Sequence, residues 1–363
     1  MTVKGGARQR RPVDPRTIVC MVFWVVGAML SVGCKGAHLV DPAPLAVRNQ
    51  HPVQLTAMLA NARPTRALSQ GVVETGANVD WTNLWLRPGK GADRIELDGE
   101  LVRITPSVRY GLGAGFDIGV ALPLLNAGGG VLDTFVENWH SQFGLPQNER
   151  DRFDQDRFTV RVDRATPSGT QTAWELQPTT LAIQDVPIEL AWFPIGSARG
   201  GTSPSDPSDG TEPLSFGLRL GVELPTGDED RGLGNGSVDT MLGFVAGYHW
   251  ERFAIYAWGG HTFMREPRSV RETGLRWRDP SVIGTGVEFA VAPRLSLSGQ
   301  IEWETSLLEE LDETHANRTQ ALFWLGCRWA VSDRTTLEAS VGEDAIRSVS
   351  PDVTFAFGLR HRW

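Results

Sequence analysis

The sequence predicts an all-β fold: a transmembrane antiparallel β-barrel of about twelve strands with one helix-containing external loop. Three observations lead to this prediction. Apolar and polar residues alternate along most of the chain, short and long connections separate the alternating segments, and the chain ends on an aromatic segment closed by Trp363. Alternation with a period of two is typical of strands with one apolar face, and short turns opposite long loops are typical of outer-membrane barrels.

The composition excludes several other classes of protein. The chain has 363 residues, of which 41% are hydrophobic, a mean hydropathy of −0.20 and a formal net charge of −8. After residue 33 it contains no apolar run long enough for a membrane helix. Its 13 Trp and 15 Phe are too many for a disordered chain. Because it has only three lysines and no basic cluster beyond the N-terminus, we expect no nucleic-acid partner.

Residues 1–37 are interpreted as a signal peptide. Basic residues occur up to Arg16, an almost wholly apolar stretch covers 18–33, and small residues close it; this order directs export. Cys34 follows as a lipidation candidate of the lipoprotein type, although Leu30 lies four positions before it instead of the usual three. Ordinary cleavage nearby is the favoured alternative.

The remaining chain divides into a flexible N-terminal periplasmic lead over 38–70 and the barrel over 71–363. Twelve segments read as strands, an even number as bacterial barrels require. Strand 96–110 changes the phase of its alternation near Leu101–Arg103 and contains Pro106, which predicts a bulge or bend. The twelve segments are 72–86, 96–110, 116–124, 180–195, 214–224, 237–249, 252–262, 283–291, 295–304, 318–331, 335–342 and 353–363.

A soluble β-sandwich also uses alternating strands, but two features favour an outer-membrane location. Aromatic residues lie near strand ends on the apolar face, as in interfacial girdles: Trp81, Trp85, Tyr110, Phe193, Tyr248, Trp250, Trp303 and Trp329. The final strand places Phe355, Phe357, Leu359 and Trp363 in register. This ending resembles the C-terminal insertion signal of outer-membrane proteins, so the expected partners are outer-membrane lipid and the barrel-assembly machinery. The oligomeric state stays open.

The segment Val131–Phe143 predicts the one convincing helix, with an apolar stripe at helical spacing. Glu137 and His140 share its polar face and are weak catalytic candidates as an acid–histidine pair. A loop helix at the barrel rim with solvated polar groups is the favoured alternative. No further ligand lies nearby for a metal, and no nucleophile elbow or phosphate-binding loop occurs, so we expect no metal, no cofactor and no enzyme activity. The stretch Phe158–Leu181 resembles a hairpin that extends the outer loops.

The polar face of the strands predicts the lining of the lumen. Acidic groups outnumber basic ones, which predicts either a preference for cations in a channel or ion-pair networks that close a narrow barrel. The predicted lining residues are Glu74, Asp80, Glu100, Arg219, Glu223, Glu288, Glu302, Glu304, Arg328, Glu338 and Arg360.

Several motifs resemble the bacterial family known as domain of unknown function 3187. They are the residues 48–52 (RNQHP), the segment 128–150 with Asp133 and Arg150, and Leu224-Pro225-Thr226-Gly227. Gln184-Asp185 stands where a Gly-Asp pair is expected, a small departure. The resemblance covers about 48–363 and implies an outer-membrane-like barrel without an assigned activity.

The sequence therefore predicts a narrow channel or transport-related barrel for small polar solutes or lipid. Two alternatives stay open: a lipid-acting outer-membrane enzyme with a site in the loop 125–150, and a soluble secreted β-protein that binds a ligand.

Overall fold

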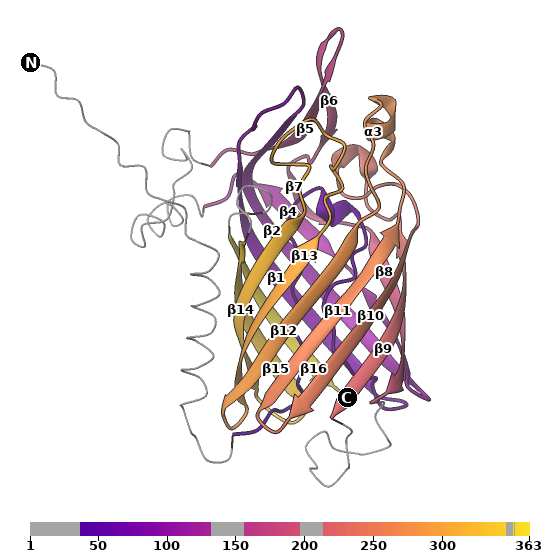
Figure 1. Cartoon of the computed structure of the whole chain (residues 1–363), viewed down its shortest axis with the longest axis vertical. Coiled ribbons are helices and arrows are strands. Elements are labelled where there is room, and N and C mark those ends of the chain that lie inside the picture. Colours follow the sequence, from indigo (N-terminus) through magenta and orange to yellow (C-terminus); the bar gives the residue numbers. More distant parts are fainter. Residues whose placement is uncertain (1–36, 132–155, 197–212, 346–350, 352) are drawn as a thin grey trace, which may run out of the picture.

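The computed structural model describes residues 37–131, 156–196, 213–345, 351 and 353–363. In this part of the chain the fold is a closed antiparallel β-barrel (Figure 1). The strands follow one another around the wall in the order β1-β16-β15-β14-β13-β12-β11-β10-β9-β8-β3-β2, and pairing of β1 with β2 closes the ring. The predicted twelve-stranded barrel is thus confirmed.

At two positions around the wall, two consecutive strands lie one after the other: β3 with β4, and β7 with β8. β4 follows β3 and pairs with the upper part of β2, and β7 precedes β8 and pairs with β4. The wall strands are β1 (Val73–Leu86), β2 (Arg94–Gly113), β3 (Phe116–Ala121), β4 (Leu124–Gly128), β7 (Thr179–Ile183), β8 (Val186–Ile195), β9 (Leu214–Leu224), β10 (Asp239–Trp250), β11 (Phe253–Phe263), β12 (Ser281–Ala292), β13 (Leu295–Glu304), β14 (Gln320–Ala330), β15 (Thr335–Asp344) and β16 (Val353–Arg362).

The two ends of the barrel differ (Figure 1). At one end, tight turns join β2 to β3, β10 to β11, β12 to β13 and β14 to β15, and β16 finishes there. We call this the short-turn end. The opposite, long-loop end carries the hairpin of β5 (Thr159–Thr166) and β6 (Gly169–Glu175), the helix α3 (Arg268–Glu272) and the short helix η3 (Glu229–Arg231). The expected helix over 131–143 lies almost wholly outside the described residues.

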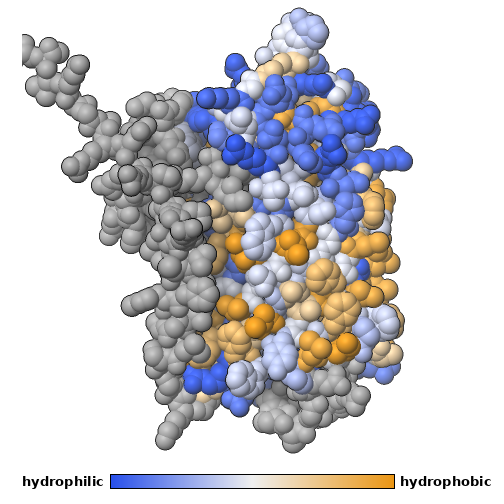
Figure 2. All heavy atoms as spheres, viewed as in Figure 1, coloured by the Kyte–Doolittle hydropathy of each residue, from blue (hydrophilic) through white to orange (hydrophobic). Residues whose placement is uncertain are grey.

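Apolar side chains cover the outside of the wall. Figure 2 shows them as a band over the barrel, below a hydrophilic long-loop end. Leu218 and Leu220 of β9, Ile255 of β11 and Leu325 of β14 point outward and are exposed. Such a band matches the apolar interior of a bilayer. No helix in the described part of the chain has the length and apolar character to cross a membrane.

The predicted aromatic positions have mixed outcomes. Tyr110, Tyr248, Trp250 and Trp329 are exposed on the outer surface. Phe193 is buried inside the barrel, so its prediction as an outward residue is wrong. Alternation in β8 places Phe193 on the same inward face as Ala191, while Trp192 between them is exposed; the register shift toward Ile195 comes only after this point.

The predicted bulge at Leu101–Arg103 is also wrong. β1 and β2 pair without a break from Val73–Tyr110 to Leu86–Leu97, and the shift in β2 falls instead at Gly111–Gly113. The apparent phase change has another cause. Near the long-loop end the interior is an apolar core, which includes Leu97 and Leu101, so here apolar residues face inward while the register continues.

Candidate functional site

The barrel interior is filled by the N-terminal segment of the same chain. Residues 41–69, which we call the plug, run from the short-turn end toward the long-loop end and back, and most of their side chains are buried. The structure therefore differs from the predicted flexible periplasmic lead over 38–70. Nothing in the local sequence pattern indicates this, because the plug has no regular structure except the short helix η1 (Gln54–Thr56).

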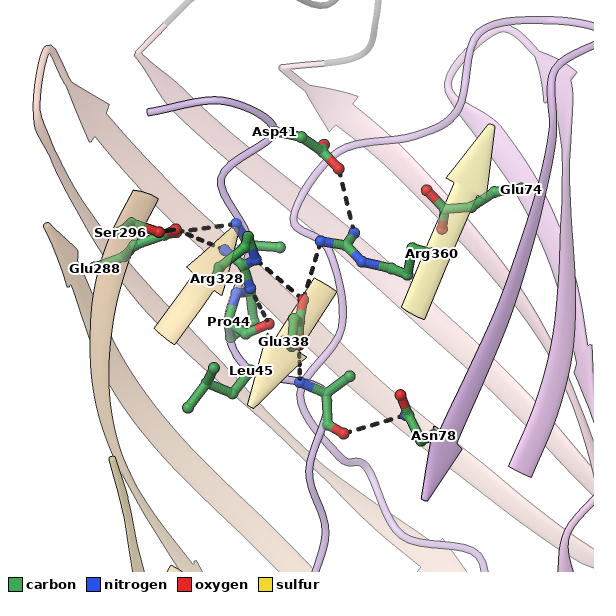
Figure 3. A network of polar contacts seen from close by, with 12 residues as sticks. Asp41, Pro44, Leu45, Glu74, Asn78, Glu288, Ser296, Arg328, Glu338 and Arg360 are labelled. Carbon is green, nitrogen blue, oxygen red and sulfur yellow. Dashed lines mark hydrogen bonds and ion pairs between the residues drawn. The ribbon is translucent and has the colours of Figure 1, made fainter. Parts of the chain in front are cut away.

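The first limb of the plug is held by wall side chains that bind its backbone (Figure 3). Glu288 accepts a hydrogen bond from Ala43 N at 3.3 Å, and Glu338 accepts one from Ala46 N at 3.2 Å. Gln300 both accepts from Leu45 N and donates to Leu45 O. Wall side chains thus replace the strand partners that this extended segment lacks.

An arginine network supports these contacts. The Arg328 guanidinium lies 2.7 Å from Glu288 and 3.0 Å from Glu338, and it donates to the carbonyl oxygen of Pro44 at 3.2 Å. Arg328 and Glu288 are each only 1% exposed. A buried charge pair of this kind is strongly destabilised when one partner is removed, because the other charge is then left without compensation.

Asp41 fixes the start of the plug at the short-turn end. Its carboxylate pairs with Arg362 at 2.7 Å and with Arg360 at 3.4 Å, both on β16. Burial by itself raises the pKa of Asp41, but the two guanidinium groups outweigh burial and hold this pKa below its ordinary value. The carboxylate therefore stays ionised and anchored to the last strand.

The tip of the plug reaches the long-loop end. Asn49 and Gln54 donate to Glu304 at 2.8 and 3.1 Å, and Gln54 accepts from Leu307 N. The tip also belongs to an apolar core, through Val53, Leu55 and Ala57. The outer loops supply other members of this core, among them Trp174, Trp277, Leu307, Leu308 and Leu311. The tip and the loops therefore close the long-loop end together.

The return limb leads back to the short-turn end. Arg63 pairs with Asp117 of β3 at 2.5 Å and also with Glu189 of β8. Burial disfavours the charged guanidinium, but these two carboxylates more than offset it, so the pKa of Arg63 lies above its ordinary value. At the exit, Gly111 allows a close backbone approach, since a Cβ there would lie 2.0 Å from Ser69 O.

The structure places the predicted lining residues, with one exception, on the inner face of the wall. Glu74, Arg219, Glu288, Arg328, Glu338 and Arg360 join the ion-pair networks of the short-turn half. Asp80, Glu223, Glu302 and Glu304 lie buried nearer the long-loop end.

Glu100 is the exception, and its assignment to the lumen is corrected. In the continuous register it pairs with Asn83, and its carboxylate accepts hydrogen bonds from Trp81 Nε1 and Val131 N. Side chains alternate along a strand, so Glu100 and Arg103 lie on opposite faces of β2. Glu100 lies on the outer face, covered by the start of the loop after β4.

The other predicted site residues have varied positions. Phe357, Leu359 and Trp363 are exposed on the outer face of the last strand, and Phe355 packs beside Val353. The lipidation candidate Cys34 and the weak catalytic candidates Glu137 and His140 lie outside the described residues.

Sequence reasoning missed the plug residues that bind the wall, among them Asn49 and Arg63. The only sequence feature that pointed to this region was the family motif over 48–52. Its Arg48 donates hydrogen bonds to the carbonyl oxygens of Gln54 and Ala57 and so stabilises the turn of the chain at the tip. Within the described ranges, no cluster of His, Cys, Asp and Glu has the arrangement of a metal site.

Comparison with known families places the chain in a family. The family model described as "Protein of unknown function (DUF3187)" matches residues 20–363. Comparison with curated proteins gives no match.

Solved structures similar to this chain include several outer-membrane barrels. The COG4313 outer membrane channel from Pseudomonas putida F1 is 13% identical with a TM-score of 0.47, over 82% of this chain and 96% of that one. The KdgM porin is 6% identical with a TM-score of 0.38, over 79% and 98%. The P. putida toluene transporter TodX is 9% identical with a TM-score of 0.33, over 89% and 94%. Likenesses at this level assign no function.

Proposed function

The chain belongs to the DUF3187 family, and we propose that it is an outer-membrane transport barrel for small polar solutes, closed in the observed state by residues 41–69. The closed barrel and its apolar outer band support the membrane location. The short-turn end, where the chain finishes, would face the periplasm, and the long loops would face outward.

One observation carries the transport proposal: the plug is held by side chains and not by sheet pairing. Among the described residues, 41–69 form no backbone-to-backbone hydrogen bond with a wall strand. Both ends of the plug, at Asp41 and Ser69, lie at the short-turn end. The plug can therefore withdraw toward the periplasm without breaking the wall or threading a chain end through it.

The lining favours a polar cargo over a lipid cargo. Behind the plug the wall carries charged and amide side chains, such as Glu288, Gln300, Glu304 and Arg328. These groups bind polar partners, whereas an acyl chain would leave those that lose the plug as a partner, such as Gln300 and Glu304, without a hydrogen bond, at a cost of about 2–7 kcal/mol for a neutral group. Small polar solutes are therefore favoured over lipid.

A reversible lock tests the proposal. Asn78 Nδ2 donates to Ala46 O at 3.2 Å, so cysteines at both positions can be joined by a short reducible thiol cross-linker in a chain without its native cysteines. In planar bilayers we expect no current steps from the cross-linked protein and intermittent steps after reduction. The chain with Ala46→Cys alone, treated identically, is the matched control.

Two results would contradict the proposal. Undiminished steps from the cross-linked chain would show that the plug does not close the passage. A folded barrel, identified by heat-modifiable gel mobility, that never conducts after reduction would remove the transport function.

A further inference from the structure

The charges of the lumen are distributed unevenly between its two halves. In the short-turn half, the buried carboxylates have arginine partners on the wall itself, as in Glu74 with Arg109, Glu189 with Arg219 and Glu288 with Arg328. Wall cations therefore balance wall anions there, whether the plug is present or not.

Nearer the long-loop end, the wall has too few cations. Five carboxyl groups, which we call the acidic ring, are buried there. Among the described wall arginines, Arg103 acts on Asp80 and Glu223, and Arg219, which is already paired with Glu189, acts on Glu302. None of the five forms an ion pair with another residue that the structure describes. The ring consists of Asp80 of β1, Glu223 of β9, Asp239 of β10, and Glu302 and Glu304 of β13.

The plug places its own cation into this ring. Arg48, which is 9% exposed, interacts electrostatically with Asp80, Glu223 and Glu302, which belong to three different strands. Its Nη2 atom donates to carbonyl oxygens of the plug, not to the wall. The guanidinium thus supplies charge to the ring while its hydrogen bonds hold the plug tip.

The ring also has unused hydrogen-bonding capacity. Oδ1 of Asp80, Oε2 of Glu223 and Oδ1 of Asp239 are buried and have no hydrogen-bond partner among the described residues. Buried acceptors are normally satisfied, and an unsatisfied one indicates a missing donor. A small solute with several N–H donors and a positive charge would supply both the donors and the charge.

We propose that the acidic ring is a binding seat for small organic cations of the guanidinium type, and that Arg48 occupies this seat while the barrel is closed. The claim that such cations are the transported solutes rests on the proposed function; the claim that they bind does not. A planar guanidinium has N–H donors whose geometry suits carboxylate oxygens. A metal ion suits the ring less well, because the described residues include no cluster with the arrangement of a metal site.

Chemical rescue of the full-length chain tests the seat. The variant Arg48→Ala removes the plug's cation, and methylguanidinium chloride is the probe. Methylurea, which is neutral and similar in shape, and sodium chloride at equal ionic strength are the controls. The measured quantity is the temperature at which the gel band of the folded barrel disappears. Millimolar methylguanidinium is expected to raise this temperature more for the variant than for the unsubstituted chain. Neither control solute should do so.

Paired wall variants locate the binding. In the Arg48→Ala chain, Glu223→Gln is expected to weaken methylguanidinium binding about tenfold or more, as removal of one partner of a buried charge contact does. Glu74→Gln is the matched control, because Glu74 lies in the short-turn half beside two arginines, and it should leave binding unchanged. If the alanine variant does not fold, Arg48→Gln keeps a donor for the plug carbonyls and takes its place.

Two results would overturn the inference: a folded variant that methylguanidinium stabilises no more than methylurea, or equal losses from Glu223→Gln and Glu74→Gln. The two proposals fail separately. Binding without any conductance would remove only the transport function, and conductance without binding would remove only the seat.

Discussion

Replacing Arg63 by alanine is expected to loosen the plug while the barrel stays folded. The substitution removes the ion pairs of Arg63 with Asp117 and Glu189. Both carboxylates keep a second guanidinium, Arg109 at 2.8 Å for Asp117 and Arg219 at 2.6 Å for Glu189. The loss is therefore smaller than the 3–5 kcal/mol that follows when a buried charge is left alone, and we expect about 2–3 kcal/mol.

This loss converts into a change of the closed–open equilibrium. Each 1.4 kcal/mol is a factor of ten, so the ratio of open to closed barrels should rise by about 30- to 150-fold. The assay is the open probability in planar bilayers, with heat-modifiable mobility measured on the same sample. Because the pKa of Arg63 is held above its ordinary value, the difference should persist throughout the neutral range.

Arg294→Ala is the matched control for this prediction. Arg294 pairs with Asp333 on the exposed short turns, where an ion pair contributes about 0–1 kcal/mol, so its loss should leave the open probability unchanged. A folded Arg63→Ala barrel with the open probability of the unsubstituted chain would refute the reasoning.

Four further predictions concern other parts of the molecule. Burial lowers the pKa of His51 to about 4 from an ordinary 6.5, so the native state binds this proton less readily than the unfolded state does. The contribution of His51 to the free energy of unfolding should therefore be complete above pH 6.5. It should fall by up to about 3 kcal/mol as the pH drops toward 4. His51→Gln should flatten that part of the pH profile of the unfolding temperature, and an unchanged profile would exclude His51 as its source. Leu220→Arg on the outer wall should destabilise the barrel in lipid vesicles by about 2–4 kcal/mol in urea titrations, while Glu251→Arg in a short turn should not. Deleting Trp363 should lower the fraction of protein in the outer membrane several-fold but leave refolding in detergent intact, and equal losses in both would speak against an insertion signal. Mass spectrometry of the mature protein should find an N-terminus produced by ordinary cleavage near residue 34, whereas a diacylglyceryl group on Cys34 would contradict this and identify a lipoprotein.

The wall could be predicted from the sequence because its cause is local. A strand between lipid and a polar lumen must alternate, so segments such as 214–224 and 295–304 carry their own signature. Glu100 shows the limit of this rule. Near the long-loop end both faces of β2 are covered, apolar residues turn inward, and polarity no longer identifies the face.

The plug could not be predicted because its structure depends on distant partners. Leu45 is held by Gln300 and Asn49 by Glu304, each 255 positions away along the chain. The plug mixes apolar and polar residues without period, since its neighbours change from ion pairs to an apolar core along its course. The family resemblance over 48–52 marked the region without indicating that it lies inside the barrel.

The central claim, that residues 41–69 fill the lumen, is tested most directly by cross-linking in intact outer membranes. Asn49 Nδ2 donates to Gln320 Oε1 near the long-loop end, whereas Ser332 lies in a turn at the opposite end. In a chain without its native cysteines, Asn49→Cys should cross-link to Gln320→Cys and not to Ser332→Cys, with the joined peptides identified by mass spectrometry. Cross-linking of position 49 to position 332 alone would place this segment in the periplasm and contradict the account.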